Sequence, residues 1–234
     1  MSELFSIQLQ NRQQQGGDGV WLDLPTTTEQ VQVALRQIGI SSDNPQGLFI
    51  SGYFAEEEKR FAISYNMVLA SNVDELNFLA SRLETLSTGE RAELNAALQA
   101  PQSELFSIGR ITDFPENVDY YVHLPDVHGP AQLGDYYLNR SGMVNMPEEW
   151  KGGIDTAQFG RYVAQQEQGA FTQYGYLVKS GDEWQKVHEG QPVPEEYRVL
   201  SFPAPEVLRD SANIPPPVQP ETEPQKVIPI ILNG

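Results

Sequence analysis

The chain of 234 residues contains no cysteine. It can therefore form neither a disulfide bond nor a thiolate metal site, which fits a reducing cytosol. No apolar stretch approaches the roughly 20 residues that a membrane-spanning helix requires, and the first residues lack the basic and apolar segments of a secretion signal. We therefore expect a soluble, cytoplasmic protein.

Motifs of the common catalytic sites are also missing. The sequence has no Walker phosphate loop, no His-Glu-x-x-His, no Gly-x-Ser-x-Gly and no Gly-x-Gly-x-x-Gly, so we expect no enzymatic activity and no cofactor. One stretch, His123-x-x-Asp126-x-His128, has the spacing of a metal site. Because it lies between a strand end and a Gly-Pro turn, we favour a surface turn. A metal-dependent hydrolase remains the alternative.

Positive charge is scarce. Lysine and arginine number 15 against 32 aspartates and glutamates, so the formal net charge is -17. Residues 1–67, 68–103, 104–180 and 181–234 carry net charges of -4, -3, -5 and -5. A chain that is acidic along its whole length repels nucleic acid and membrane surfaces and attracts a partner with a basic groove. Solubility, or adaptation to high salt, would explain the charge without a partner.

An internal repeat organises the chain. The sequence Ser-Glu-Leu-Phe-Ser-Ile at residues 2–7 recurs unchanged at residues 103–108, and Trp21–Pro25 corresponds to Tyr121–Pro125, one residue out of step. Each copy leads into a segment with helical apolar spacing. The pattern predicts two related units, each a pair of short strands followed by a helix, although shared strand composition would also produce it.

A helical module is predicted between the two units. Apolar residues there recur at steps of three and four and form one stripe, namely Val73, Leu76, Leu79, Leu83 and Leu86. Ser71 with Asp74 would cap this helix, and Ser87 with Glu90 would begin a second one. The acids off both stripes should face water: Glu84, Glu90 and Glu93.

Residue patterns also predict the remaining elements. Strands are expected at residues 3–10, 19–24 and 47–54, with Phe61, Ile63 and Tyr65 as a fourth candidate, and at residues 104–111, 118–124 and 171–178. Helices are expected at residues 130–141 and 154–167. Beyond residue 190 the chain holds ten of its 17 prolines, which predicts an extended linker. Its apolar end, residues 227–232, would either dock or fray.

Several of these stretches together resemble a known family. They are Gly19–Pro25, Asp74–Ala80 with Leu83, Leu133–Tyr137, Pro147 with Ile154-Asp155 and Phe159-Gly160-Arg161, and Gly169–Thr172 before a Gly-Tyr strand. Their order and spacing are similar to those of the ArdA family of antirestriction proteins, acidic DNA mimics carried by mobile genetic elements. The resemblance covers roughly residues 3–180 and leaves residues 181–234 outside.

The resemblance implies a curved, elongated α+β protein of three small domains that forms a homodimer through its C-terminal domain. The expected parts are an N-terminal α+β unit (residues 1–67), a central helical module (68–103), a C-terminal α+β unit (104–180) and a Pro-rich extension (181–234). Such proteins look like bent duplex DNA and occupy the DNA groove of type I restriction and modification enzymes. The implied partner is the methyltransferase core of such an enzyme, with no direct binding to nucleic acid or membrane.

Charge spacing agrees with mimicry. B-DNA carries one charge per about 1.7 Å of axis, and helix carboxylates three or four residues apart lie about 5–6 Å from one another, so a line of acids can imitate a phosphate strand. The predicted mimic acids are Asp74, Glu75, Glu84, Glu90, Glu93, Asp113, Glu116, Asp119, Asp126, Asp135, Glu148, Glu149 and Asp155. Each has a plainer alternative as a helix cap, an ion-pair partner or a solubilising charge.

Four apolar or aromatic residues are candidates for the C-terminal core or the dimer contact, with core packing favoured. They are Leu133, Tyr136, Tyr137 and Phe159. A function of another class also stays open, an acidic adaptor that acts through its Pro-rich tail, since proline-rich segments recruit groove-bearing domains. Truncation at residue 190 is expected to separate the two, because a mimic would keep its inhibition without the tail.

Overall fold

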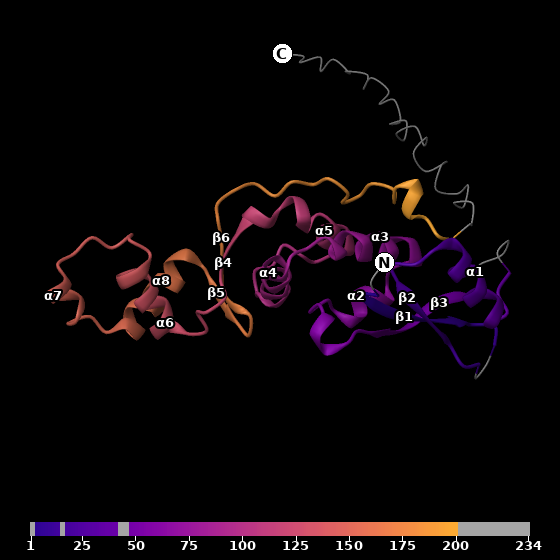
Figure 1. Ribbon diagram of the computed structural model, residues 1–234, viewed down its shortest axis with the longest axis horizontal. Coiled ribbons are helices and arrows are strands. Elements are labelled where there is room, and N and C mark those ends of the chain that lie inside the picture. The colour runs from indigo at the N-terminus through magenta and orange to yellow at the C-terminus, as the bar shows by residue number, and fades with distance from the viewer. Residues whose placement is uncertain (1–2, 15–16, 42–46, 201–234) are drawn as a thin grey trace, which may run out of the picture. The chain divides into compact units, whose positions relative to one another are not determined.

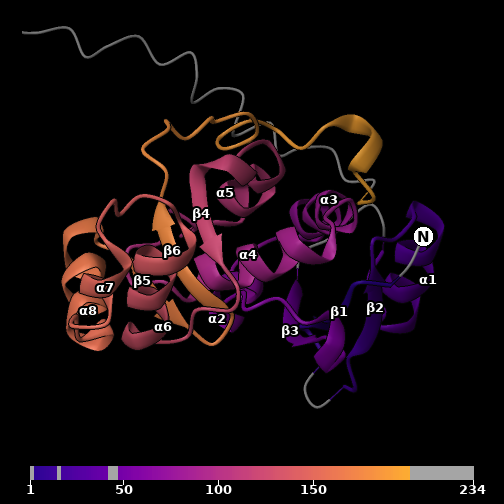
Figure 2. The same ribbon diagram turned by 60° about the vertical axis from the view of Figure 1, so that its left-hand side comes forward.

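The computed structural model describes residues 3–14, 17–41 and 47–200. The predicted linker beyond residue 200 and the apolar end at residues 227–232 lie outside these ranges. Within them the chain forms eight α-helices and two small antiparallel sheets (Figure 1; Figure 2). The predicted α+β class is therefore confirmed.

The first sheet is built from the three N-terminal strands. These are β1 (Phe5–Asn11), β2 (Val20–Leu24) and β3 (Leu48–Phe54), in the order β2-β1-β3. Phe5, Ile7 and Leu9 on β1 are buried and alternate with more exposed residues, as the period of two requires. Helix α1 (Thr28–Gln37) follows β2 and begins with a capping box between Thr27 and Gln30. All three strands were predicted within two residues.

The fourth predicted strand, at Phe61, Ile63 and Tyr65, is wrong. Phe61 and Ile63 are buried, but they lie in irregular chain before the short helix α2 (Tyr65–Leu69). The Asn95 side chain on a later helix accepts a hydrogen bond from Ala62 N at 2.7 Å and donates one to Arg60 O at 3.3 Å. An amide side chain therefore takes the place that a neighbouring strand would fill.

The two predicted helices of the central module are confirmed as α3 (Val73–Glu84) and α4 (Thr88–Gln99). All five residues of the predicted stripe are buried, as expected of an amphipathic helix, although Leu86 lies just after the end of α3. The predicted capping box of Ser87 and Glu90 begins α4. The cap of α3 lies one residue later than predicted, because Asn72 with Glu75 forms the box instead of Ser71 with Asp74.

The second copy of the repeated hexapeptide does not form a strand. Residues 103–108 lead into the short helix α5 (Ile108–Thr112), and Ser107 caps it by accepting a hydrogen bond from Arg110 N at 3.3 Å. Phe106 is 64% exposed, whereas its counterpart Phe5 is 3% exposed. The first copy pairs with a strand on each side, and no such strands lie beside the second in the described chain. The prediction of two structurally equivalent units is therefore wrong.

The second sheet contains β4 (Tyr121–Leu124), β5 (Ala170–Thr172) and β6 (Gly175–Lys179), in the order β4-β6-β5. A single strand was predicted over residues 171–178, but the chain turns back at Gln173-Tyr174 and makes a hairpin. Gly175 supplies the positive φ of 119° that this turn needs. The strand predicted at residues 118–124 begins only at Tyr121, after a 3₁₀ turn.

The C-terminal part contains four helical segments, of which the first and the last cross at two glycines. They are α6 (Pro130–Asp135), a π-helical turn (Tyr136–Arg140), α7 (Glu148–Lys151) and α8 (Thr156–Glu167). A Cβ atom on Gly134 would lie 1.9 Å from Thr156 O, and one on Gly160 would lie 1.8 Å from Pro130 O. These contacts explain why both helices need glycine where they touch. The predicted helices at residues 130–141 and 154–167 are confirmed.

Buried apolar side chains form two clusters. The larger one runs from Leu4 on the first sheet, through α3 and α4, to Leu177 and Val199. The smaller one contains Val127, Leu133 and Tyr176, with partly buried neighbours from α8 and the second sheet. The stretch that follows β6, residues 182–200, is called the strap below. It runs past α5 and α3 (Figure 1), and its Val199 belongs to the larger cluster.

Candidate partner-binding surface

The thirteen predicted mimic acids differ widely in exposure. The exposed ones are Glu116, Asp119, Asp126, Glu148, Glu149 and Asp155. The half-buried ones are Asp74, Glu75, Glu84, Glu90, Glu93 and Asp135. The predicted set therefore does not form one uniformly exposed surface.

Asp113 is fully buried, which corrects the prediction that it is exposed. Its carboxylate accepts hydrogen bonds from His188 N at 2.6 Å and from Glu189 N at 3.2 Å. A buried carboxylate is costly unless such donors satisfy it. Asp113 therefore holds the strap and presents no charge to a partner.

Asp74 holds the far end of the strap in the same way. Its Oδ1 atom accepts hydrogen bonds from Val199 N at 2.8 Å and from Leu200 N at 2.9 Å. Two asparagines assist: Asn117 accepts from Gln185 N at 2.7 Å, and Asn77 donates to the strap carbonyl of Tyr197 at 3.0 Å. Because the strap forms no sheet, these side chains supply the partners that its backbone needs.

An ion-pair network fixes the middle of the strap. The buried Arg110 guanidinium donates to Glu189 Oε1 at 3.0 Å and to Glu104 Oε2 at 2.8 Å. Lys179 reaches the other oxygen of Glu104 at 2.6 Å. Although burial acts against the charge, the two carboxylates raise the pKa of Arg110. Sequence reasoning missed this network because its members lie far apart in the chain.

Three of the predicted acids cap helices. Glu75 and Glu90 occupy the third position of the capping boxes on α3 and α4. Asp155 caps α8, where it accepts hydrogen bonds from Ala157 N at 2.9 Å and Gln158 N at 3.0 Å. Hydrogen bonds from Ser87 lower the pKa of Glu90. The helix dipole favours acids at a helix N-terminus, and capping does not prevent them from also facing a partner.

Another three are paired with cations. Glu116 contacts Arg82, Asp135 lies 2.7 Å from Arg140, and Glu148 lies 2.7 Å from Lys151. A hydrogen bond from Asn139 is the main cause that lowers the pKa of Asp135, and Arg140 adds to it. Asp119, Asp126 and Glu149 make no salt bridge within the described chain.

Glu93 lies near two other predicted acids, Asp119 and Glu90. Burial, together with the negative charges of Asp119 and Glu90, raises its pKa to about 8. Its Oε1 atom is buried and has no hydrogen-bond partner within the described ranges. The prediction that Glu93 faces water is therefore wrong, and at neutral pH its carboxyl is mainly protonated. Glu90 and Glu84, also expected to face water, are half-buried.

Comparison with known families identifies the chain. The model of the family "Antirestriction protein (ArdA)" matches residues 17–178, which is more than half of the sequence. The chain belongs to the ArdA family. The resemblance noted in the sequence is thereby confirmed, and membership implies that the chain acts against restriction, with a restriction-modification enzyme as its partner. No individual curated protein gives a significant match.

All thirteen predicted acids lie inside the ArdA match, whereas β1 and the strap lie outside it. The strap adds exposed acids that sequence reasoning had placed in the Pro-rich extension, namely Asp182, Glu183, Glu195 and Glu196. In the sequence, these acids stand out only because they occur as two adjacent pairs. Over the described ranges, no helix combines the length and apolar character needed to cross a membrane.

The three residues of the alternative metal site do not come together to hold an ion. In the described part of this ArdA chain, no group of three or more histidine or acidic side chains has the placement that a metal needs. His123 instead donates from Nε2 to Tyr174 O at 2.7 Å and so fastens the hairpin of the second sheet. Asp126 and His128 are exposed.

Three of the four core or dimer candidates, Leu133, Tyr136 and Tyr137, belong to the smaller cluster of this ArdA chain. Leu133 is fully buried, and Tyr137 donates to Glu167 Oε1 at 2.5 Å. Tyr136 lies edge-on to Tyr137, and Phe159 is half-buried. Leu133 thus packs inside the protomer. Exposed apolar side chains in the same part of the chain are Met143, Trp150 and Tyr162.

Proposed function

We propose that this ArdA protein inhibits type I restriction-modification enzymes by imitating DNA. Its exposed carboxylates take the place of backbone phosphates and occupy the DNA groove of the methyltransferase core, without any chemical step. The affinity comes from pairing with lysines and arginines of the enzyme, so it weakens as salt concentration rises. The family match supports the antirestriction function, and the net charge of -17 supports mimicry as its mechanism.

The acids left exposed are the observation that carries the proposal. Asp119, Asp126, Glu148, Glu149 and Asp155 face solvent. The structure uses Asp74 and Asp113 internally and neutralises Glu93, so the mimic set is smaller than the sequence predicted. The effect of Asp119 and Glu90 on the pKa of Glu93 supports a field that several carboxylates share.

A patch variant tests mimicry. It combines Asp119→Asn, Asp126→Asn, Glu148→Gln, Glu149→Gln and Asp155→Asn; asparagine also caps helices, so α8 keeps its start. The matched control neutralises five exposed acids outside the predicted set, with Asp18→Asn, Asp23→Asn, Glu29→Gln, Glu57→Gln and Glu58→Gln.

Inhibition of a purified type I enzyme is the readout. The patch variant should lose at least about tenfold in potency, because each lost pairing with a cation weakens binding and the losses accumulate. The control should lose much less. Equal inhibition by the patch variant and the wild type, with both folded, would remove the mimic mechanism.

The homodimer belongs to the same proposal. Because Leu133 is buried inside the protomer, the contact is better assigned to exposed residues of the same part, such as Trp150 and Tyr162. Light scattering on the wild type and on Trp150→Ala with Tyr162→Ala measures the mass directly. A wild type that stays monomeric at micromolar concentration would contradict dimerisation.

A further inference from the structure

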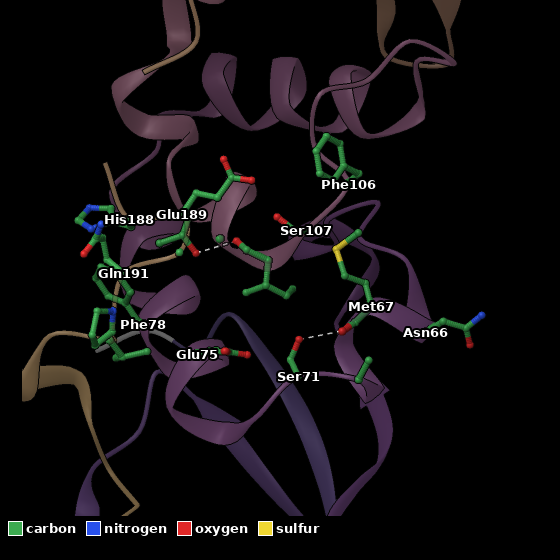
Figure 3. A pocket seen from close by; sticks show the side chains of 17 residues that line it. Asn66, Met67, Ser71, Glu75, Phe78, Phe106, Ser107, His188, Glu189 and Gln191 are labelled. Carbon is green, nitrogen blue, oxygen red and sulfur yellow. Dashed lines mark hydrogen bonds between the residues drawn. The ribbon is translucent and has the colours of Figure 1, made fainter. Parts of the chain in front are cut away.

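A pocket of about 790 Å³ opens between α2, α3, α5 and the strap. Figure 3 shows Glu75 and Ser71 on one side of it and Phe106 and Ser107 on the other. The strap closes a third side with residues 188–193. Asp113 and Arg110 hold that wall through the contacts described above, so the pocket depends on the strap.

The lining of the pocket is largely apolar. Met67, Phe78 and Ile108 contribute to it, and Phe106 at its border is 64% exposed. Phe78 itself is packed between strap residues, with the His188 ring 4.9 Å and the Tyr197 ring 4.7 Å from its centroid. An apolar wall of this kind favours a ligand with an aliphatic or aromatic part.

One anionic group in the pocket has no cation to balance it. Glu75 makes no salt bridge among the described residues, and its Oε2 accepts only a long bond of 3.4 Å from Asn72 N. The other acid of the lining, Glu189, is paired with Arg110 at 3.0 Å and Lys186 at 3.4 Å. The charge of the pocket is therefore complementary to a single cation beside Glu75.

We propose that this pocket receives one arginine side chain, flanked by an apolar residue, from the restriction enzyme that the chain inhibits. The inference rests on the proposed function and adds an anchor to it. A planar guanidinium matches a carboxylate with two parallel hydrogen bonds, and its aliphatic stem packs on apolar side chains such as Met67. Burial of the exposed Phe106 ring would complete the contact.

The pocket is built partly from residues outside the family match, unlike the thirteen predicted mimic acids, of which Glu75 is one. One of its walls is made by residues 188–193, which lie beyond the family match that ends at residue 178. A surface of collective charge tolerates the loss of any one acid, whereas an anchor in a pocket concentrates binding energy in a few residues. The two therefore respond differently to single substitutions.

The test uses two peptides and three variants of the full chain. The probe is acetyl-Leu-Arg-Leu-amide, and its control replaces arginine with citrulline, which has nearly the same shape without the charge. Glu75→Gln removes the anion but keeps a residue that serves in a capping box, and Phe106→Ala trims an exposed ring. Phe54→Ala is the matched control, since Phe54 is 57% exposed and lies outside the pocket.

Titration followed by NMR should place the arginine peptide at Met67 and Ile108 with millimolar affinity, and the citrulline peptide should bind at least fivefold more weakly. Glu75→Gln and Phe106→Ala should each raise the concentration for half inhibition of the enzyme about fivefold to tenfold, with Phe54→Ala unchanged. Equal binding of both peptides, or wild-type inhibition by Glu75→Gln, would overturn the anchor. Dissociation of a homodimer by Glu75→Gln would also overturn it, because a second copy would then be the occupant.

The failures of the two proposals are distinguishable. If the five-acid patch variant loses inhibition while Glu75→Gln keeps it, mimicry stands and the anchor falls. If Glu75→Gln loses inhibition while the patch variant keeps it, the phosphate mimic falls.

Discussion

The buried carboxylate of Asp113 accepts a hydrogen bond from the backbone nitrogen of His188 at 2.6 Å, across 75 residues of sequence. A second bond from Glu189 N completes the clamp. One of the 32 acids of the chain is thus used to fasten the strap.

Asp113→Ala should lower the free energy of unfolding by about 2–4 kcal/mol, because two backbone donors lose their charged acceptor in a buried place. The strap should also become sensitive to protease near residue 188. Urea unfolding and limited proteolysis measure the two effects. The control Asp126→Ala, at an exposed site, should change stability by less than about 0.5 kcal/mol, and equal effects of the two would contradict the clamp.

Truncation separates the strap from the residues that follow it. A chain that ends at Leu200 keeps both hydrogen bonds to Asp74 and the buried Val199, so it should fold and inhibit as the full chain does. A chain that ends at Gly190 loses these contacts and should unfold at a lower temperature. Loss of inhibition by the longer form, if it stays folded, would favour the adaptor that acts through its Pro-rich tail.

The sequence correctly predicted features that depend only on residues close together in the chain. The capping box of Ser87 and Glu90 needs only four consecutive residues, and the stripe of α3 depends on spacing within one helix. Both were predicted correctly. The repeated hexapeptide fails because strand formation depends on neighbours: at Phe5 two strands lie alongside, whereas at Phe106 the Ser107 cap turns the chain into a helix.

The candidate site was harder to predict for the same reason. The sequence around an acidic residue does not show whether its carboxylate faces solvent or accepts a hydrogen bond from a distant backbone nitrogen. Asp113 is satisfied by residues 75 and 76 positions away, and Asp74 by residues 125 and 126 positions away. No short-range pattern contains that information, whereas Asp119 and Glu149 are exposed as predicted.

The crossing of α6 and α8 gives a prediction about packing. Gly134→Ala should cost at least about 1–3 kcal/mol, since the new methyl group would lie 1.9 Å from Thr156 O and the helices must move apart. Gly152→Ala is the control, because no atom lies within 4 Å of its added Cβ. Thermal unfolding compares the two. A similar melting temperature for both variants would show that the helices do not cross as described.

Glu93 gives a prediction about pH. Its carboxyl has a pKa of about 8 in the folded chain against 4.5 for an unperturbed glutamate. The free energy of unfolding should therefore be highest below about pH 4.5 and fall as pH rises toward 8, because the unfolded chain loses this proton first. Glu93→Gln should remove this fall and raise stability at pH 8 by about 1–2 kcal/mol, less than the full shift implies because the side chain keeps some contact with water.

Urea unfolding of Glu93→Gln and wild type from pH 5 to pH 8.5 measures the difference. Glu149→Gln serves as the control, since Glu149 is exposed and its substitution should leave the pH profile unchanged. A wild-type profile parallel to that of Glu93→Gln would mean that Glu93 ionises normally.

The most direct measurement is competition between this chain and duplex DNA for the methyltransferase core of a type I enzyme, at low and at high salt. We predict that the chain displaces labelled DNA from the enzyme, that displacement weakens steeply between about 50 and 200 mM salt, and that the five-acid patch variant fails to displace it. A ternary complex that holds the enzyme, the DNA and the chain together would contradict occupation of the DNA groove.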